Sequence, residues 1–185
     1  MAVIYRPKHE RQIKPSDRYG RYNCGAVATA IAIDRATLGG VMVNGEDVRA
    51  LTTEPVPDPA SPGLNIPQLV EAAGDLHVVL TRVSGGTFTR LLDYLREGRG
   101  VSLSGEGAAL GPNTCQPDFV GAHQIFLNNL STDGTSILVY NPLCPTYRWL
   151  AVTTVRKYAE RFGALHGGLA YAITRVTPLI SKQIN

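Results

Sequence analysis

The sequence has few cysteines and no arrangement of side chains typical of a metal site. Its 185 residues include three cysteines and four histidines. Three is an odd and low number for a disulfide framework, and the spacing matches neither C-x-x-C nor H-x-x-x-H. We therefore expect one or more free thiols and no bound metal ion. The cysteines are Cys24, Cys115 and Cys144.

Long apolar segments are also missing. The N-terminal stretch MAVIYRPKHERQ carries charge where a signal peptide needs an apolar segment of about 7–15 residues. No later segment approaches the roughly 20 apolar residues that a membrane-spanning helix needs. We expect cytoplasmic synthesis without a signal peptide, and no membrane partner. If the protein acts outside a membrane, another component must carry or release it.

Strong charge of one sign is absent as well. The net charge is +3, and the Lys and Arg residues are scattered rather than gathered in a basic run. This distribution argues against a nucleic-acid partner. Apolar residues make up 44% and charged residues 18%, which is typical of a globular protein that buries a core. Because domains most often hold about 100–150 residues, we expect one domain spanning residues 1–185.

Local patterns predict helices mainly in the first half of the chain and strands mainly in the second. The Ala- and Ile-rich run at 24–37 lacks proline and precedes Gly39-Gly40, which predicts a buried helix with Cys24 in its first turn. Four prolines within 52–63 predict a loop. The expected fold class is α+β. Further elements are expected as helices at 66–73, 87–97 (with Leu91, Leu92 and Leu95 inward) and 153–163, and as strands at 76–83, 101–103 and 169–176.

A long loop is expected at 104–122. This stretch has four glycines, two prolines and little periodicity. Loops longer than about 12–15 residues are uncommon unless they are functional or disordered. Because this one delivers the chain directly to His123, we expect it to cover one side of a substrate cleft. The proline-rich loop at 52–63 is expected to lie away from the chemistry.

A β-hairpin is expected at 123–141. Two β-rich runs, HQIFLNNL and SILVYN, flank STDGT, whose Asp133-Gly134 pair is a strong turn signal. The midpoint of 123 and 141 is position 132, close to the centre of that turn, so His123 and Asn141 should lie nearly opposite each other. Cross-strand Cβ atoms of this kind are about 4.5–5.5 Å apart, within reach for the Asn carbonyl to accept from the imidazole. The alternative is that His123 only begins a strand and Asn141 only ends one.

Cys24 and this hairpin together are a candidate for nucleophilic catalysis. At a helix N-terminus, backbone N–H groups and the helix dipole favour a thiolate, so we expect the pKa of Cys24 to be lowered. A cysteine with a distant His and Asn is the pattern of a cysteine nucleophile. The alternative is that Cys24 is a small buried apolar residue. Cys115 and Cys144 open no helix, and we expect neither to take part.

Three segments resemble the papain-like cysteine peptidases. They are YNCGAVATAI at 22–31, GAHQIFL at 121–127 and LVYNP at 138–142, in the order Cys, His, Asn. The resemblance is nearest to the bacteriocin-leader-processing branch (double-glycine peptidases) and its phage and bacterial relatives. Residues 152–162 further resemble the short helix that the family places before its last strand. This sequence departs from that branch in having Ala122 between Gly and His and in having Asn141 where Asp is more common.

The resemblance implies a papain-like fold and a set of catalytic residues. A central N-terminal helix that carries Cys24 would pack against an antiparallel β-sheet that carries His123 and Asn141. Cys24 would be the nucleophile, His123 the base and Asn141 the residue that orients the base. Gln12 resembles the glutamine whose side-chain amide helps to form the family's oxyanion hole; the alternative is an ordinary surface glutamine. No metal or organic cofactor is implied.

The implied function is hydrolysis of a peptide bond through an acyl-enzyme intermediate. Substrates that fit are a leader peptide, a protein or the peptide stem of bacterial peptidoglycan. The phage relatives imply that a phage-encoded protein of this kind would be virion-associated or released. Two alternatives stay open. The same triad serves an acyl or amide transferase when an amine replaces water, and the same fold can serve a catalytically silent binding or virion protein.

The remaining histidines and the tryptophan give weaker signals. His9, His77 and His166 lack a facing Asn and a cysteine at a helix start, so structural or exposed positions are expected. Trp149, the sole tryptophan, directly follows the hairpin. It could flank the His and Asn of that hairpin, with a place in the core as the alternative.

Overall fold

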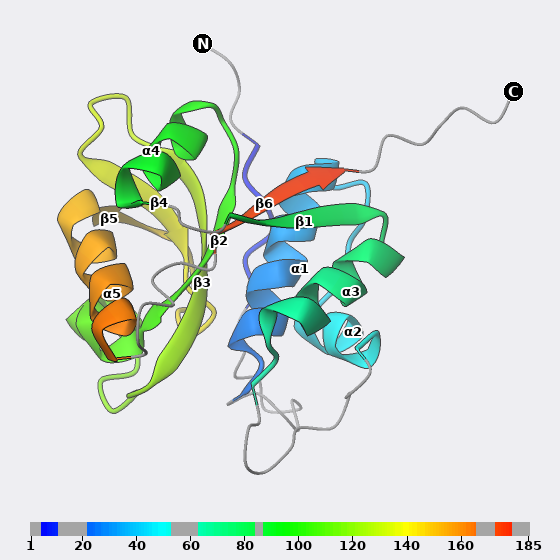
Figure 1. The fold of residues 1–185 in the computed structure, drawn as a ribbon, viewed down its shortest axis with the longest axis horizontal. Coiled ribbons are helices and arrows are strands. Elements are labelled where there is room, and N and C mark those ends of the chain that lie inside the picture. The colour runs from blue at the N-terminus through cyan, green and yellow to red at the C-terminus, as the bar shows by residue number, and fades with distance from the viewer. Residues whose placement is uncertain (1–4, 11–21, 53–62, 84–86, 166–172, 179–185) are drawn as a thin grey trace, which may run out of the picture.

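The computed structural model describes residues 5–10, 22–52, 63–83, 87–165 and 173–178 (Figure 1). Within these ranges, no helix has both the length and the apolar character needed to cross a membrane. The elements, in chain order, are α1 Cys24–Thr37, α2 Gly45–Ala50, α3 Ile66–Asp75, β1 Val78–Val83, α4 Phe88–Arg96, β2 Val101–Glu106, the 3₁₀ helix η2 Gly107–Thr114, β3 Ala122–Leu130, β4 Ser136–Tyr140, β5 Arg148–Ala151, α5 Val152–Leu165 and β6 Ile173–Pro178.

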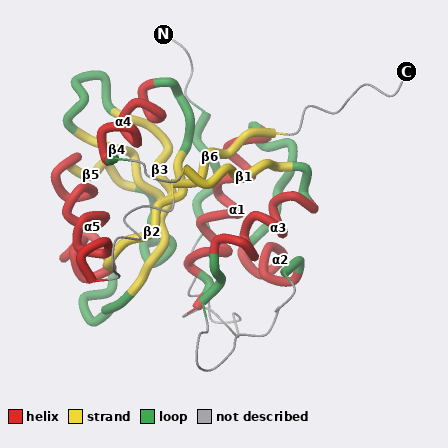
Figure 2. The backbone as a smooth tube through the Cα atoms, viewed as in Figure 1, coloured by secondary structure: helices red, strands yellow, loops and turns green. Residues whose placement is uncertain are grey.

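The strands form a six-stranded sheet between layers of helices. Their order is β1-β6-β2-β3-β4-β5, and each pair of neighbours is antiparallel. α1 packs against β3 on one face, and α4 and α5 lie on the other (Figure 1, Figure 2). α2 and α3 pack on α1 from the side away from β3 and β4 (Figure 1). The α+β class is confirmed, with the helix that begins at Cys24 set against an antiparallel sheet.

α1 is buried between two layers, as expected from its apolar sequence. It is rich in alanine, the best helix former, and it ends where Leu38 and Gly39 adopt φ angles of 52° and 84°. On the sheet side it packs against Phe126 and Tyr140. On the opposite side it packs against Val48 of α2. Because α1 is packed on both sides, the position of its first turn, which begins with Cys24, is fixed.

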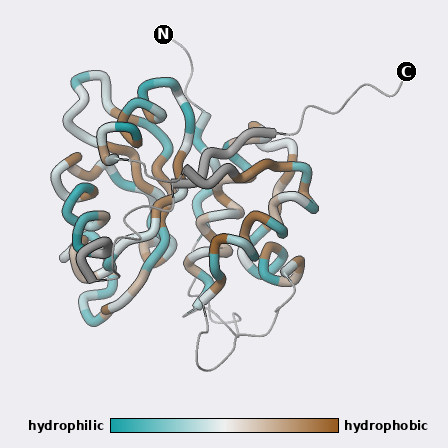
Figure 3. The backbone as a smooth tube through the Cα atoms, viewed as in Figure 1, coloured by the Kyte–Doolittle hydropathy of each residue, from teal (hydrophilic) through white to brown (hydrophobic). Residues whose placement is uncertain are grey.

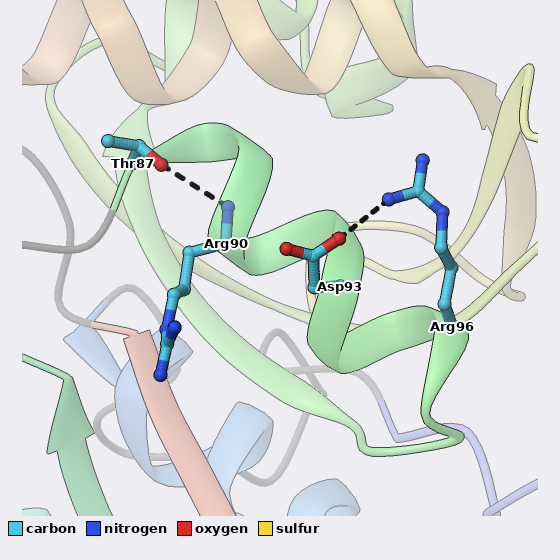
Figure 4. Close-up of polar contacts among 4 residues, drawn as sticks. All are labelled: Thr87, Arg90, Asp93 and Arg96. Atoms are coloured by element: carbon cyan, nitrogen blue, oxygen red, sulfur yellow. Dashed lines mark hydrogen bonds and ion pairs between the residues drawn. The ribbon is translucent and has the colours of Figure 1, made fainter.

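α4 shows the opposite pattern, with one polar and one apolar side. Thr87 caps it by accepting a hydrogen bond of 3.3 Å from the N–H of Arg90, and Asp93 pairs with Arg96 at 2.7 Å on the exposed side (Figure 4). The three leucines expected to face inward are buried, together with Phe88. Figure 3 shows more hydrophilic residues along α5, which covers the sheet beside α4, than along α3.

The stretch 104–122 is only partly a loop, contrary to the prediction. β2 continues to Glu106, and η2 follows before the turn that leads into β3. A 3₁₀ helix has no 3.6-residue period, and Gly111, with a φ of 55°, interrupts this one beside Pro112. The sequence pattern also missed α2 and β5, whose six and four residues are too short for a clear periodicity.

The hairpin of β3 and β4 forms in a register different from the expected one. Phe126 pairs with Tyr140, and an irregularity of the β-bulge type then shifts the pairing nearer the turn. Continuing the pairing of Phe126 with Tyr140 would place position 143 opposite His123. Asn141 is therefore two residues away from the position opposite His123, and the two are diagonal rather than direct neighbours.

Gly105 in β2 has no room for a side chain. A Cβ at this position would lie 2.2 Å from the ring of Tyr158, which is fully buried on α5. We expect Gly105→Ala to lower the free energy of unfolding by about 1–3 kcal/mol, the usual range for overpacking, as measured by urea unfolding. Gly74→Ala is the control, because a Cβ at Gly74 in α3 meets nothing within 4 Å. The control should be neutral or stabilising by up to about 1 kcal/mol, and equal destabilisation by both variants would contradict the prediction.

Candidate active site

Cys24 is the first residue of α1, and a buried arginine holds the chain that leads to it. The carbonyl of Asn23 accepts a hydrogen bond of 2.8 Å from the N–H of Val27, which begins the helix. Arg49 of α2 is 2% exposed and donates from Nε to Oδ1 of Asn23. Its Nη2 donates to the carbonyl of Tyr22 at 2.9 Å. α2 thereby fixes the two residues before Cys24.

His123 and Asn141 make the hydrogen bond that the hairpin was expected to provide. Nε2 of His123 lies 2.8 Å from Oδ1 of Asn141, and the two residues are 2% and 3% exposed. Oδ1 also accepts from the N–H of Leu143 at 3.0 Å, and Nδ2 of Asn141 donates to the carbonyl of Asn113 at 3.1 Å. These contacts hold the amide with its oxygen towards the imidazole, so Nε2 carries the ring proton.

The second nitrogen of the imidazole is left free to accept a proton. Nδ1 of His123 is buried and has no hydrogen-bond partner in the described part of the chain. In the neutral ring with the proton on Nε2, Nδ1 carries the lone pair. Because a buried polar atom without a partner is rare, this nitrogen calls for a functional explanation.

Cys24 lies beside the start of β3. Burial of its thiol raises the pKa of Cys24, although the N–H groups of Gln124, Gly25 and Cys24 itself, and the charge of Arg49, favour the thiolate. Gln124 is the residue that follows His123. The expectation of a lowered pKa is therefore wrong, because the helix N-terminus acts locally whereas desolvation depends on the whole fold. Cys24 as a residue remains partly exposed.

Burial also determines the charge of His123. It lowers the pKa of the imidazole to about 4, against the smaller opposing effect of the hydrogen bond to Asn141. The direction of both pKa shifts favours an uncharged imidazole and an uncharged Cys24 thiol over an ion pair of the two.

Aromatic side chains support the imidazole and its strand. The ring centroid of Phe119 lies 5.1 Å from that of His123, edge to face. The hydroxyl of Tyr158 donates to the carbonyl of His123. Trp149 is 47% exposed on the edge strand β5, whose inward residue is Leu150, so the alternative that places Trp149 in the core is wrong. Phe119 takes the position against the imidazole that was considered for Trp149.

The stretch that precedes β3 borders the site, as expected. Asn113 of η2 contacts Asn141, and Phe119 contacts His123. The base of this stretch is closed by a hydrogen bond of 2.9 Å from the N–H of Gly107 to the carbonyl of Gly121. Its predicted role in covering a substrate cleft stays a prediction.

Several residues singled out in the sequence lie outside the described ranges. These are Gln12, His166 and most of the proline-rich loop, at 53–62, so the roles expected for them stay predictions. The other two histidines match their expected structural or exposed positions. His9 donates from Nε2 to the carbonyl of Cys144 at 2.8 Å, and His77 is exposed.

Cys115 and Cys144 form a disulfide, a pairing that the low and odd number of cysteines did not predict. Cys24 is the free cysteine of the three. The fold brings the end of η2 against the turn after β4, so that Cα atoms 29 positions apart in sequence lie 5.1 Å apart. A count of cysteines gives no sign of this proximity, because it arises from the pairing of β2, β3 and β4.

The described residues offer no metal site. They contain no group of three His, Cys, Asp or Glu side chains placed to hold a metal ion. A cavity of about 560 Å³ lies farther along α1, where Ala30, Ile31 and Asp34 line it, and neither Cys24 nor His123 borders it. The site itself presents a thiol and an imidazole oriented by an amide.

Three residues that shape the site gave no signal in the sequence. Arg49 and Asn113 act on Cys24 and Asn141 only through contacts that the fold creates. Gln124 stands next to His123, yet its side chain donates to Ser102 at 2.5 Å and only its backbone reaches the thiol. No short motif encodes such backbone and tertiary contacts.

Solved structures include proteins of similar fold. A C39-like peptidase from Bacillus anthracis superposes with a TM-score of 0.60 at 14% identity, over 96% of this chain and 98% of that chain. The peptidase domain of Streptococcus ComA, a bifunctional ABC transporter involved in a quorum-sensing pathway, gives a TM-score of 0.53 at 15% identity, over 92% of this chain and 98% of that chain. No protein-family model and no curated protein matches the sequence. The chain therefore has the papain-like fold of the C39 peptidases.

Proposed function

We propose that this protein is a cysteine peptidase in which Cys24 is the nucleophile, His123 the base and Asn141 the residue that orients the base. The observation that carries the proposal is the buried 2.8 Å hydrogen bond between His123 and Asn141. It leaves Nδ1 of the imidazole as a buried acceptor, and the N–H of the next residue, Gln124, reaches the thiol of Cys24. An imidazole oriented by an amide, with a partly exposed cysteine at a helix start, is the arrangement that thiol catalysis requires.

Acylation begins with the thiol proton. Nδ1 of His123 takes this proton while Sγ of Cys24 bonds to the carbonyl carbon of the substrate, which gives a tetrahedral intermediate and an imidazolium. We assign the oxyanion to the N–H of Cys24 and the side chain of Gln12, and losing one such donor typically costs about 10²–10³ in rate. The C–N bond then breaks, the imidazolium protonates the leaving amine, and a thioester remains on Cys24.

Deacylation uses the same groups with water as the nucleophile. Nδ1 of His123 takes a proton from a water molecule while the oxygen of that water bonds to the thioester carbon. The C–S bond then breaks. The sulfur of Cys24 recovers the proton, and the product leaves with a new carboxyl group. Asn141 stays neutral throughout and keeps the ring proton on Nε2.

The raised pKa of Cys24 is compatible with this route. Because both pKa shifts favour a neutral thiol and a neutral imidazole in the free site, the negative charge on sulfur forms during attack, when the proton moves to His123. The N–H of Gln124 and the charge of Arg49 favour that charge as it forms.

We propose a peptide or protein as substrate, cleaved without a metal or organic cofactor by residues 1–185 acting as one domain. The resemblance to leader-processing peptidases makes a leader peptide the first substrate to test. A peptidoglycan stem peptide is the second. Phage relatives in the same group make release from a host cell, or carriage in a virion, the proposed setting.

The experiment is labelling of the oxidised protein with a peptidyl epoxide, followed by incubation with a mixed peptide library. Mass spectrometry should find one adduct, on Cys24, because the other two cysteines are paired. Cleavage of library peptides should fall in proportion to the labelled fraction, since Sγ of Cys24 is the attacking atom and the label occupies it. Full labelling of Cys24 with cleavage unchanged would rule out the proposed nucleophile.

A further inference from the structure

The Cys115–Cys144 disulfide joins two segments that both hold Asn141. Cys115 directly follows η2, two residues after Asn113, and Cys144 stands three residues after Asn141 in the turn that follows β4. One sulfur, Sγ of Cys144, lies 3.4 Å from the carbonyl oxygen of Asn113. The cross-link is thus in contact with the same carbonyl that accepts from Nδ2 of Asn141.

Each polar atom of the Asn141 side chain depends on one of these segments. Nδ2 donates to Asn113 at 3.1 Å, on the η2 side, and Oδ1 accepts from Leu143 at 3.0 Å, on the side of the turn. The carbonyl of Asn141 accepts from the N–H of Cys144 at 2.9 Å, which closes the turn. The amide can present its oxygen to His123 only while the two segments stay together.

Other described contacts hold η2 at its start and along its middle. Leu110, 1% exposed, packs in the core with residues of α5. The bonds of Gly121 to Gly107 and Glu106 close the base of the stretch, where it leaves β2. The hydroxyl of Thr114 bonds to Gly111 and Gln116, within the stretch itself. The disulfide is the covalent tie between the end of η2 and the turn that carries Asn141.

We propose that the Cys115–Cys144 disulfide is a positioning element of the active site, and that its reduction lowers peptidase activity by releasing Asn113 and thereby Asn141. This inference rests on the proposed function. In the active form the thiol of Cys24 is reduced, while the Cys115–Cys144 disulfide, three residues from Asn141, is intact. Activity is low in a reducing cytosol and high in an oxidising compartment or outside the cell.

The switch is an ordinary thiol–disulfide exchange. A thiolate of dithiothreitol attacks the partly exposed Cys115, the S–S bond breaks, and the sulfur of Cys144, which is 1% exposed, leaves and takes up a proton. The second thiol of the reagent then displaces Cys115. Two protein thiols form, and the reagent ends as its cyclic disulfide, so two electrons and two protons pass to the protein.

The experiment compares the effect of reduction in the wild type with its effect in Asn141→Ala. Reduction should lower kcat of the wild type by about tenfold or more, because small displacements of catalytic groups have effects of that size. In Asn141→Ala it should change kcat by less than about twofold, since two changes that act through one contact are not additive. Mass spectrometry after alkylation confirms that each reduced sample has its thiols free.

Cys115→Ser/Cys144→Ser is the control for the reagent. Its kcat should equal that of the reduced wild type and should not respond to dithiothreitol. Equal losses in wild type and Asn141→Ala would overturn the inference, because they would indicate a general structural role. An unchanged kcat in wild type with three free thiols would overturn it as well.

A second measurement separates this inference from the proposed function. Nuclear magnetic resonance titration should show the pKa of His123 moving from about 4 towards its ordinary value on reduction. Loss of the hydrogen bond to Asn141 by itself lowers this pKa, but water that enters beside the released amide relieves burial, which is the larger of the two effects. This readout needs no substrate. If the oxidised protein cleaves no peptide, the proposed function fails while the titration still decides the positioning role, and an unshifted pKa overturns that role.

Discussion

Replacing Cys24 with alanine should lower kcat for peptide hydrolysis by about 10⁴-fold or more, because the variant has no atom to form the acyl-enzyme. The fold should survive, since a small, partly exposed side chain is lost at a helix start that Asn23 and Arg49 hold in place. Peptide cleavage followed by mass spectrometry measures the first effect. Thermal unfolding measures the second.

Cys24→Ser is the matched variant, because it keeps a hydroxyl of similar size at the same helix position. It should cleave far more slowly than wild type, since an alcohol is a much weaker nucleophile than a thiol when the base is unchanged. Activity of Cys24→Ala within about tenfold of wild type would contradict the mechanism, since loss of a nucleophile has effects of several orders of magnitude.

His123→Gln should lower kcat by about 10²–10⁴-fold, the usual contribution of a general base. Its effect on pH dependence is a sharper readout. Wild-type activity should fall on the acid side with a midpoint near 4, because below that pH the imidazole of His123 is protonated and cannot take the thiol proton. The variant should lose that midpoint, and its residual activity should rise with pH as the thiol of Cys24, whose pKa burial raises, ionises by itself.

Acid unfolding must be measured alongside this profile. His123 has a lower pKa when folded than when unfolded, so the unfolded chain binds the proton first and stability falls as the pH drops from 6.5 to about 4. Circular dichroism across this range identifies the pH at which unfolding starts. A wild-type midpoint near 6.5 in folded protein, or an identical profile for His123→Gln, would contradict the assignment of His123 as the base.

Elements with a strong local pattern were predictable from the sequence. α1 follows from an alanine-rich run that ends at glycines, and α4 follows from three leucines spaced to lie on one side of a helix. The pairing of His123 with Asn141 followed from a hairpin signal. Its register did not, because the irregularity in the pairing of β3 with β4 depends on the whole sheet.

The parts that the sequence did not reveal are those created by tertiary contact. The pKa of Cys24 depends on how much protein surrounds the thiol, and that effect exceeds the local one of the helix start. The disulfide joins positions that only the sheet brings together. Phe119 reaches His123 across a turn with no periodicity. In each case the deciding quantity is proximity in space, which single-sequence patterns do not contain.

β6 is the last of the described strands along the chain, yet it is an inner strand of the sheet, paired with β1 on one side and β2 on the other. Val78 meets Pro178, which a ribosome adds one hundred positions later. In a growing chain, the four strands β2, β3, β4 and β5 can pair with their neighbours early. β1, in contrast, has no partner strand until β6 emerges. Such distant pairing is slow, and open strand edges invite other chains. Until β6 emerges, β1 and one edge of β2 therefore lack their partner strand, and the sheet is incomplete.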